Sequence, residues 1–290
     1  MLIRFSCAVT FPLRVVWGDS FCTLLYCVLH HALAHRWTDY PTRSRYYPSG
    51  IASSQTRNTP IVTPIDGRRT RIVEVFVGEY ASGKTEVAIN RALALRSEYG
   101  AVTLLDLDTE EPVYTVRSVK PILEERGLEV VALDPDAVFG LGEAGVPVTA
   151  EMLSVLGRTG SIVVDVGYGV HGAAALNLLE GIEEEPNVRV YCVVNARRPM
   201  TSTPELIAQY LRSLDWCHFI VNNTHLGDET TLEVILGGIR TVTRASEMTG
   251  IPVAAVSVAV DVAERLRLTE KDLGAPLWTL ELFMRGSPRL

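Results

Sequence analysis

The stretch Gly78-Glu79-Tyr80-Ala81-Ser82-Gly83-Lys84-Thr85, or GEYASGKT, decides the fold of this 290-residue chain. It satisfies the phosphate-binding pattern G-x-x-x-x-G-K-[ST]. The apolar run 72–77, IVEVFV, precedes it, and the helix-compatible run 86–93, EVAINRAL, follows it. A strand, a glycine loop and a helix in this order form the context in which the pattern binds phosphate. The stretch therefore predicts a phosphate-binding loop.

The residue types in this loop suit a polyphosphate. Glycine at Gly78 and Gly83 lets backbone N–H groups approach the ligand, because a Cβ at these tight positions would hold them away. The helix that follows directs its positive N-terminal end at the phosphates. We expect Lys84 to reach the β and γ oxygens and the Thr85 hydroxyl to bind Mg²⁺. All of residues 78–85 are predicted to contact the nucleotide.

The composition predicts one substantial folded domain with an appendage, since 47% of the residues are apolar and 21% are charged. A net charge of -7 argues against a general nucleic-acid binder. No apolar run reaches the roughly 18 residues that would indicate a membrane span. The five cysteines form no C-x-x-C pair. Cys192 and Cys217 lie in or beside predicted buried strands, so we expect them to be buried thiols of a cytoplasmic protein.

The first 70 residues differ from the remainder, because they contain no lysine, many arginines and three of the five cysteines. Neither a helical nor a strand period runs through them. We predict that residues 1–70 are a disordered extension, or upstream sequence read as protein because the start was placed too early. A mitochondrial-type leader and a signal peptide are the alternatives. The nucleotide-binding domain is expected at residues 71–290.

From Arg71 onward, short apolar strands alternate with helical patterns, which is typical of a parallel sheet with crossover helices. We predict a three-layer α/β domain of the P-loop NTPase type with a mostly parallel sheet of about seven strands. The segment Val262 to Phe283 is expected to be helical cover. The predicted strands are 72–77, 101–108, 128–133, 161–166, 188–194, 218–221 and 252–258.

Polar side chains follow several of these strands, at the sheet edge where ligands bind in open parallel sheets. We expect Asp165, after the fourth strand, to hold the metal ion together with Thr85 and Asp106. Asp108 is expected to orient the attacking water, with a structural turn as the alternative for the Asp106 and Asp108 pair. Asn222 is expected to bind the base through its amide. The predicted catalytic residues are Lys84, Asp108 and Asp165.

The base is predicted to be adenine, because the guanine-reading pattern N-K-x-D is absent. The corresponding stretch after the sixth strand is Asn222-Asn223-Thr224-His225. We therefore expect ATP and Mg²⁺ as the cofactors.

These motifs together resemble the MinD/ParA and CobQ/CobB group of P-loop ATPases, which belong to the SIMIBI type. The likeness covers Arg71 to about Leu268, and its most specific parts are GEYASGKT and the stretch LLDLDTEEP at residues 104–112. The resemblance implies a γ-phosphate-sensing switch at Asp108, a Walker B acid at Asp165 and a nucleotide-controlled homodimer. MinD and ParA proteins carry a second lysine where this chain has Glu79. This difference moves the likeness toward the CobQ/CobB and dethiobiotin-synthetase branch, or toward uncharacterised ATP-binding relatives.

The motifs are compatible with three functions. The first is an Mg²⁺-dependent ATPase that switches shape or protein partner. The second is an ATP-dependent synthetase that activates a small carboxylate, with Arg197, Arg198 and the loop Gly140 to Gly145 near the substrate. The third is a nucleotide-binding scaffold without hydrolysis, because a phosphate-binding loop indicates binding more directly than catalysis.

Overall fold

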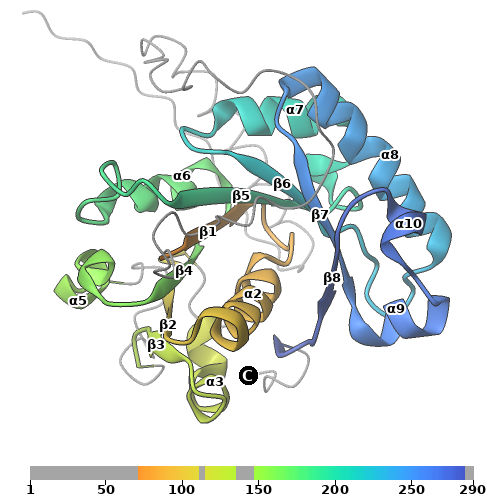
Figure 1. Cartoon of the computed structure of the whole chain (residues 1–290). Helices are drawn as coiled ribbons and strands as arrows, with labels where there is room; N and C mark the ends of the chain where they lie inside the picture. Colours follow the sequence, from red (N-terminus) through yellow and green to blue (C-terminus); the bar gives the residue numbers. More distant parts are fainter. Residues whose placement is uncertain (1–70, 111–114, 135–146, 285–290) are drawn as a thin grey trace, which may run out of the picture. The chain divides into compact units, whose positions relative to one another are not determined.

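The computed structural model describes residues 71–110, 115–134 and 147–284, which Figure 1 shows as coloured ribbon. Their eight strands form one sheet in the order β3-β2-β4-β1-β5-β6-β7-β8. Every neighbouring pair in this sheet is parallel. The strands are β1 (Val73–Gly78), β2 (Val102–Leu107), β3 (Glu129–Val131), β4 (Ser161–Val166), β5 (Val188–Val194), β6 (Phe219–Asn222), β7 (Val253–Ala259) and β8 (Leu277–Leu280).

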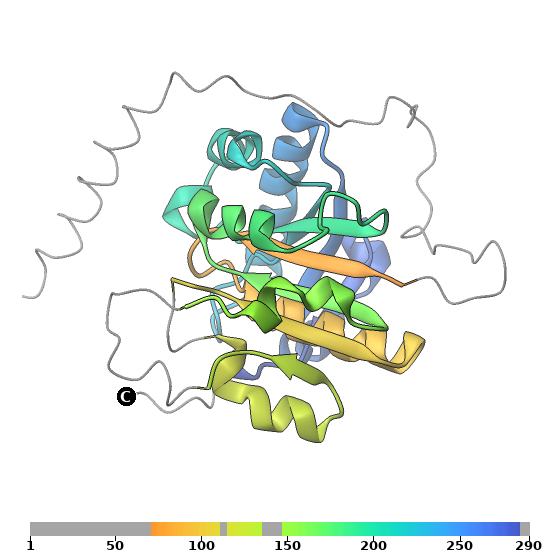
Figure 2. The ribbon, with the colours of Figure 1, turned by 90° about the vertical axis from the view of Figure 1, so that its left-hand side faces the viewer.

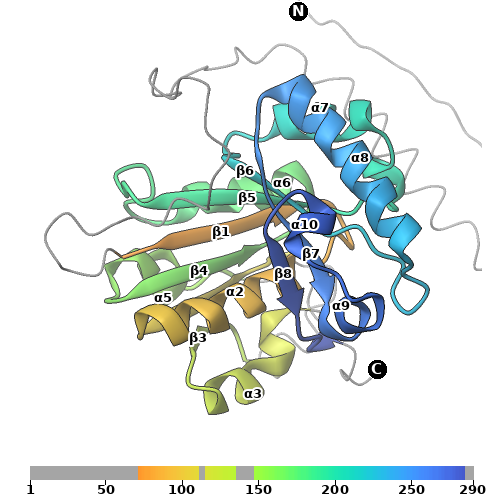
Figure 3. The same cartoon turned by 45° about the vertical axis from the view of Figure 1, so that its right-hand side comes forward.

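Helices cover both faces of the sheet, so the predicted three-layer α/β fold is confirmed. Helices α2 and α3 lie on one face, and α6, α7 and α8 lie on the other (Figures 2 and 3). A separate apolar core fills the space between the sheet and each helical layer. The α-helices are α2 (Lys84–Tyr99), α3 (Lys120–Glu125), α5 (Ala150–Leu153), α6 (Gly169–Ala174), α7 (Pro204–Ser213), α8 (Leu232–Thr249), α9 (Val260–Leu266) and α10 (Glu270–Leu273). Short 3₁₀ turns are η1 (Val116–Val119), η3 (Val155–Gly157), η4 (Ala175–Leu178) and η5 (Pro199–Thr201).

The central strands are apolar on both sides because both faces of the sheet are covered. All six residues of β1, β2 and β4 are buried. Strand β1 lies between β4 and β5, near the middle of the sheet. The chain visits β2, β3 and β4 on one side of β1 and then β5 to β8 on the other. The loop after β1 therefore lies where the strand order changes direction, which is the usual ligand-binding position in such sheets.

The C-terminal part of the sheet differs from the sequence-based expectation. Helix α10 ends at Leu273 and is capped by Gly274, which has φ +66°. Leu277–Leu280 then forms β8, paired in parallel with β7. The expectation of helical cover up to Phe283 is therefore wrong for this segment. Pro276 explains part of the difference, since proline does not fit inside a helix.

Two predictions concern parts of the chain that lie outside the described residues. These are the N-terminal extension at residues 1–70 and the substrate loop at Gly140 to Gly145. Within the described ranges, no helix is long and apolar enough to cross a membrane.

Candidate functional site

The predicted phosphate-binding loop lies between the end of β1 at Gly78 and the start of α2 at Lys84. A Cβ on Gly78 would lie 2.5 Å from the carbonyl oxygen of Val193. Gly83 has φ +88°, and a Cβ there would lie 2.3 Å from Nδ2 of Asn223. Both positions therefore require glycine, because the backbone passes too close to its neighbours for any side chain.

Two side chains from neighbouring strands hold the loop. Asn223, directly after β6, donates from Nδ2 to the carbonyl oxygen of Ser82 at 2.8 Å, and its Oδ1 accepts from Ser257 Oγ at 2.9 Å. Arg198, after β5, donates from Nε to the carbonyl oxygen of Ala81 at 3.1 Å. Ala81 has φ +54°, which is uncommon for a residue with a Cβ. These contacts hold Ala81 in its left-handed conformation.

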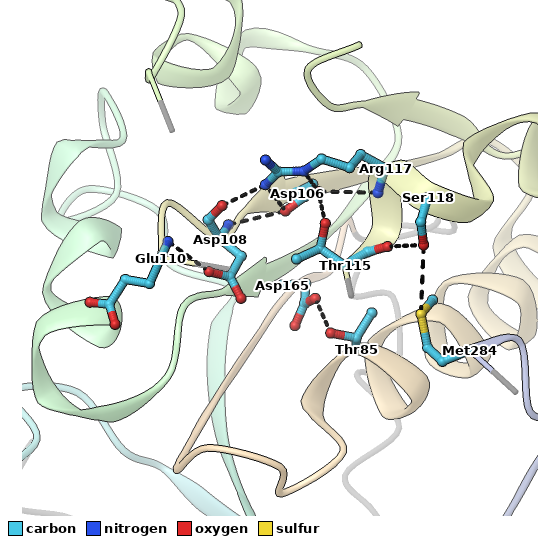
Figure 4. Close-up of polar contacts among 9 residues, drawn as sticks. All are labelled: Thr85, Asp106, Asp108, Glu110, Thr115, Arg117, Ser118, Asp165 and Met284. Atoms are coloured by element: carbon cyan, nitrogen blue, oxygen red, sulfur yellow. Dashed lines mark hydrogen bonds and ion pairs between the residues drawn. The ribbon is translucent and has the colours of Figure 1, made fainter. Parts of the chain in front are cut away.

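Thr85 and Asp165 form the candidate magnesium site (Figure 4). Thr85 Oγ1 donates to Asp165 Oδ2 at 2.6 Å. Burial raises the pKa of Asp165 to about 8, although the charge of Lys84 and the hydrogen bond from Thr85 oppose this shift. Among the described residues, nothing hydrogen-bonds to Asp165 Oδ1. A buried carboxylate with one unpartnered oxygen, beside a hydroxyl, fits Mg²⁺, which prefers oxygen ligands and would neutralise the charge.

Asp106 is buried in an ion pair with Arg117 (Figure 4). Its Oδ2 accepts from Arg117 Nε at 2.8 Å, from the Arg117 backbone N–H at 3.1 Å and from Thr115 Oγ1 at 2.9 Å. Its Oδ1 accepts from Arg117 Nη2 and from the Asp108 backbone N–H, both at 3.1 Å. Donors of the protein thus engage both carboxylate oxygens. This arrangement does not favour the metal-ligand role predicted for Asp106.

Asp108 is the first residue after β2 and lines the candidate cavity. Only 5% of its surface is exposed. Its Oδ1 accepts from the Glu110 backbone N–H at 2.9 Å, which is the hydrogen bond of an Asx turn. The turn predicted as the alternative for this pair is therefore present, and Asp108 also borders the cavity. Its water-orienting role stays a prediction.

The cavity has a volume of about 420 Å³, within the range of small-molecule sites. Polar residues of the loop, with Asp108 and Arg198, line one part of it. Val258, Val262 and Leu280 line the part beside β7 and β8. A charged phosphate chain suits the first part, and a flat heterocycle suits the second.

The C-terminal segment after β8 forms a wall of this cavity. Glu86, in the first turn of α2, accepts from the backbone N–H of Phe283 at 3.0 Å and of Met284 at 2.8 Å. Asn90 Oδ1 accepts from the backbone N–H of Glu281 at 2.9 Å. These three contacts hold the segment against α2. As a result, Leu282 and Met284 line the cavity.

The predicted site residues fall into two groups. Those that line the cavity are Tyr80, Ala81, Gly83, Lys84, Thr85 and Asp108. Those that do not contribute to its lining are Gly78, Glu79, Ser82, Asp106, Asp165 and Asn222. Asn222 Oδ1 accepts from Thr224 Oγ1 at 2.6 Å, whereas the neighbouring Asn223 lines the cavity.

Several lining residues were not predicted. They include Asn223, Thr224 and His225 after β6, Ser257 in β7, Tyr168 after β4, and the C-terminal segment. The available signal for Asn223, Thr224 and His225 was their position after the apolar strand β6, which does not identify the side chain that reaches a ligand. Ser257 lies within β7, where no such signal was available in the sequence. Of the two arginines assigned to a substrate, Arg198 lines the cavity and Arg197 does not.

Comparison with known proteins gave matches to solved structures alone. No protein-family model and no curated protein matches the sequence. The chain is similar to signal recognition particle receptor FtsY from Elizabethkingia anophelis in complex with GDP, at 18% identity and a TM-score of 0.42, over 76% of this chain and 62% of that one. It is also similar to cell division protein FtsY from Thermotoga maritima, at 18% identity and a TM-score of 0.41, over 65% of this chain and 62% of that one.

A further match is the signal recognition particle 54 kDa protein from Aeropyrum pernix K1 in complex with GDP, at 25% identity and a TM-score of 0.40. It covers 65% of this chain and 42% of that one. The chain thus spans less than two thirds of the length of each of these three structures. The resemblance to the MinD/ParA and CobQ/CobB group stays a prediction.

Proposed function

We propose that the chain binds Mg²⁺ and ATP in this cavity and hydrolyses the nucleotide as part of a nucleotide-dependent switch. The observation that carries the proposal is the Thr85 to Asp165 hydrogen bond of 2.6 Å next to the phosphate-binding loop. In addition, Asp165 Oδ1 is buried and lacks a hydrogen-bond partner among the described residues. A hydroxyl and a carboxylate in this relation suit the metal ion of a nucleotide site.

Each residue of the site has a distinct task in this proposal. The backbone of residues 78–85 surrounds the phosphates, and Lys84 contacts the β and γ oxygens. The Thr85 hydroxyl and the Asp165 carboxylate hold Mg²⁺, which would neutralise charge that develops on the phosphate oxygens. Asp108, at the cavity edge, orients the attacking water. Such positioning and electrostatic help account for most of the catalysis of phosphoryl transfer.

Adenine is the base that we propose, because guanine recognition needs a carboxylate that accepts from its ring N–H and its amino group. The acidic residues among the described cavity lining are Glu86 and Asp108. Glu86 already accepts two backbone N–H groups, and Asp108 follows β2, on the opposite side of β1 from the apolar part of the cavity. The residue three positions after Asn223, where a guanine-reading loop has an acid, is Leu226.

Calorimetric titration of the full chain with ATP and with GTP, each in Mg²⁺ and in EDTA, tests the proposal. We expect ATP to bind more tightly than GTP by about tenfold or more, because a purine lacking its polar partner loses affinity. Mg²⁺ should strengthen the binding. Tighter binding of GTP would overturn the choice of base, and failure of both nucleotides to bind would overturn the proposed function.

The same site supports one alternative. Arg198 borders the cavity, so a small carboxylate bound beside the phosphates is the arrangement of an ATP-dependent synthetase. Phosphate release that requires an added small acid would favour the synthetase. Slow release without any acid, altered by a partner protein, would favour the switch. The homodimer implied by the family resemblance stays a prediction, for which the oligomeric state with and without ATP is the measurement.

A further inference from the structure

The main chain of Asp108 is held on both sides by one buried ion pair. Its N–H donates to Asp106 Oδ1 at 3.1 Å, and its carbonyl oxygen accepts from Arg117 Nη2. We propose that the Asp106–Arg117 pair is a positioning device that fixes the Asp108 carboxylate at the edge of the cavity. The inference rests on the proposed function, in which Asp108 orients water.

The contacts of Asp106 also join two separate parts of the chain. Besides holding Asp108, its carboxylate accepts from Thr115 Oγ1 and from the backbone N–H and guanidinium of Arg117 (Figure 4). The Asp106 carboxylate thus binds Asp108 on one side and both Thr115 and Arg117 on the other. Because Arg117 also binds the Asp108 carbonyl oxygen, we expect a shift of Arg117 to move Asp108 at the edge of the cavity.

The energetics of the pair favour a positional role. Both side chains are buried, and Arg117 is only 1% exposed. Removing two charges from water costs free energy that their attraction does not reliably recover. In the described part of the chain, Arg117 Nη1 has no hydrogen-bond partner either, which adds to this cost. The pair is therefore poorly suited to stabilise the fold, whereas the rigid two-armed guanidinium is well suited to fix geometry.

A double-mutant cycle between Arg117 and Asp108 tests the inference. Lysine in Arg117→Lys keeps the charge but cannot form the two-armed contact, so the Asp108 carboxylate should move. We expect kcat for ATP to fall by about tenfold or more in Arg117→Lys, because displacements near 1 Å have such effects. The dissociation constant for ATP should change little. In the Asp108→Asn background, Arg117→Lys should have no further effect on kcat, since residues acting together are non-additive.

A matched control comes from the Arg91–Glu74 pair, in which the carboxylate is buried and the arginine is partly exposed. Arg91→Lys removes the same kind of contact and should leave kcat unchanged, because Arg91 does not touch Asp108. Equal loss of kcat in both lysine variants would overturn the inference, as would additive effects of Arg117→Lys and Asp108→Asn. If Arg117→Lys does not fold, Thr115→Val takes its place, because it removes one neutral donor to Asp106. It should lower kcat in the wild type and have no further effect in the Asp108→Asn background.

Amide hydrogen exchange separates this inference from the proposed hydrolysis, because it needs no turnover. We expect the Asp108 and Glu110 amides to exchange about tenfold faster in Arg117→Lys than in the wild type, while the sheet amides stay protected. Arg91→Lys should leave both rates unchanged. Unchanged exchange in Arg117→Lys would overturn the inference even where the wild type hydrolyses ATP. Faster exchange without any wild-type turnover would overturn the hydrolysis alone.

Discussion

The carboxylate of Glu74, in β1, is bonded by both arms of the Arg91 guanidinium from α2. Arg91 Nε lies 3.0 Å from Oε2, and Nη2 lies 2.8 Å from Oε1. Trp278 of β8 packs on the same guanidinium, with 4.4 Å from Cζ to the ring centroid. These contacts connect the strand that precedes the phosphate-binding loop, the helix that follows it and the last strand of the sheet.

Arg91→Ala is expected to destabilise the protein by about 3–5 kcal/mol, because it leaves the fully buried Glu74 without a counter-charge. Urea unfolding measures this change. Arg244→Ala is the control, since the Arg244–Glu247 pair is exposed on both sides and should contribute little. Equal stabilities of Arg91→Ala and the wild type would show that the Arg91–Glu74 pair does not stabilise the fold.

Lys84→Ala is expected to weaken ATP binding by about a hundredfold or more, since a charge-assisted contact to phosphate is lost from a buried site. Calorimetry measures the affinity, and circular dichroism should show an unchanged fold. Lys120→Ala is the matched control, because Lys120 forms a partly exposed pair with Glu124 at 3.8 Å, outside the cavity. Unaltered ATP affinity in Lys84→Ala would contradict the assignment of the loop.

Asp165→Asn is expected to remove the dependence of ATP affinity on Mg²⁺. Asparagine can still accept the Thr85 hydroxyl hydrogen but carries no charge for the metal ion. The affinity for ATP is measured in Mg²⁺ and in EDTA, and the two values should converge in the variant. If Mg²⁺ strengthens ATP binding as much in Asp165→Asn as in the wild type, the metal site lies elsewhere.

Asp108→Asn is expected to lower hydrolysis by about a hundredfold or more, the scale of losing general-base or water-orienting help. ATP should bind normally, because the backbone loop and Lys84 remain. Phosphate release is compared with the ATP dissociation constant in the same preparation. Wild-type turnover in this variant would leave Asp108 as a turn residue alone.

Removal of the C-terminal segment after β8 is expected to weaken binding of the base without weakening binding of the phosphates. A chain ending at Leu280 lacks Leu282 and Met284, so its affinity for ATP should fall by about tenfold or more as apolar contact area is lost. Its affinity for inorganic tripolyphosphate should stay unchanged. A chain ending at Met284 keeps the wall and is the control. A parallel loss of both affinities would mean that the segment supports the loop itself.

The sequence predicted the parts of the fold that local patterns determine. The predicted ranges of the fourth and fifth strands agree with β4 and β5, because continuous apolar runs begin and end sharply there. Strand β8 was mistaken for helix, since its four residues gain their conformation from pairing with β7 and from the contact of Trp278 with Arg91. Such contacts lie far apart in the sequence and leave no local pattern.

The same distinction applies to the site. Lys84 and Thr85 belong to a contiguous motif, so their position beside the cavity could be predicted. Asp106 and Asp108 are only two residues apart, and the sequence does not show that one binds Arg117 while the other borders the cavity. The contact of Asn223 with Ser82 joins residues 141 positions apart, so it becomes visible when the sheet is assembled.

The residues that line the cavity extend from Tyr80, just after β1, to Met284, just after β8. Parallel sheets of this kind have a high contact order, and their distant strands pair late because long loops must close first. We therefore expect the cavity to be complete only in the fully folded protein. For this chain, ligand binding followed during refolding would report the final cooperative step of folding, well after helical signals have recovered.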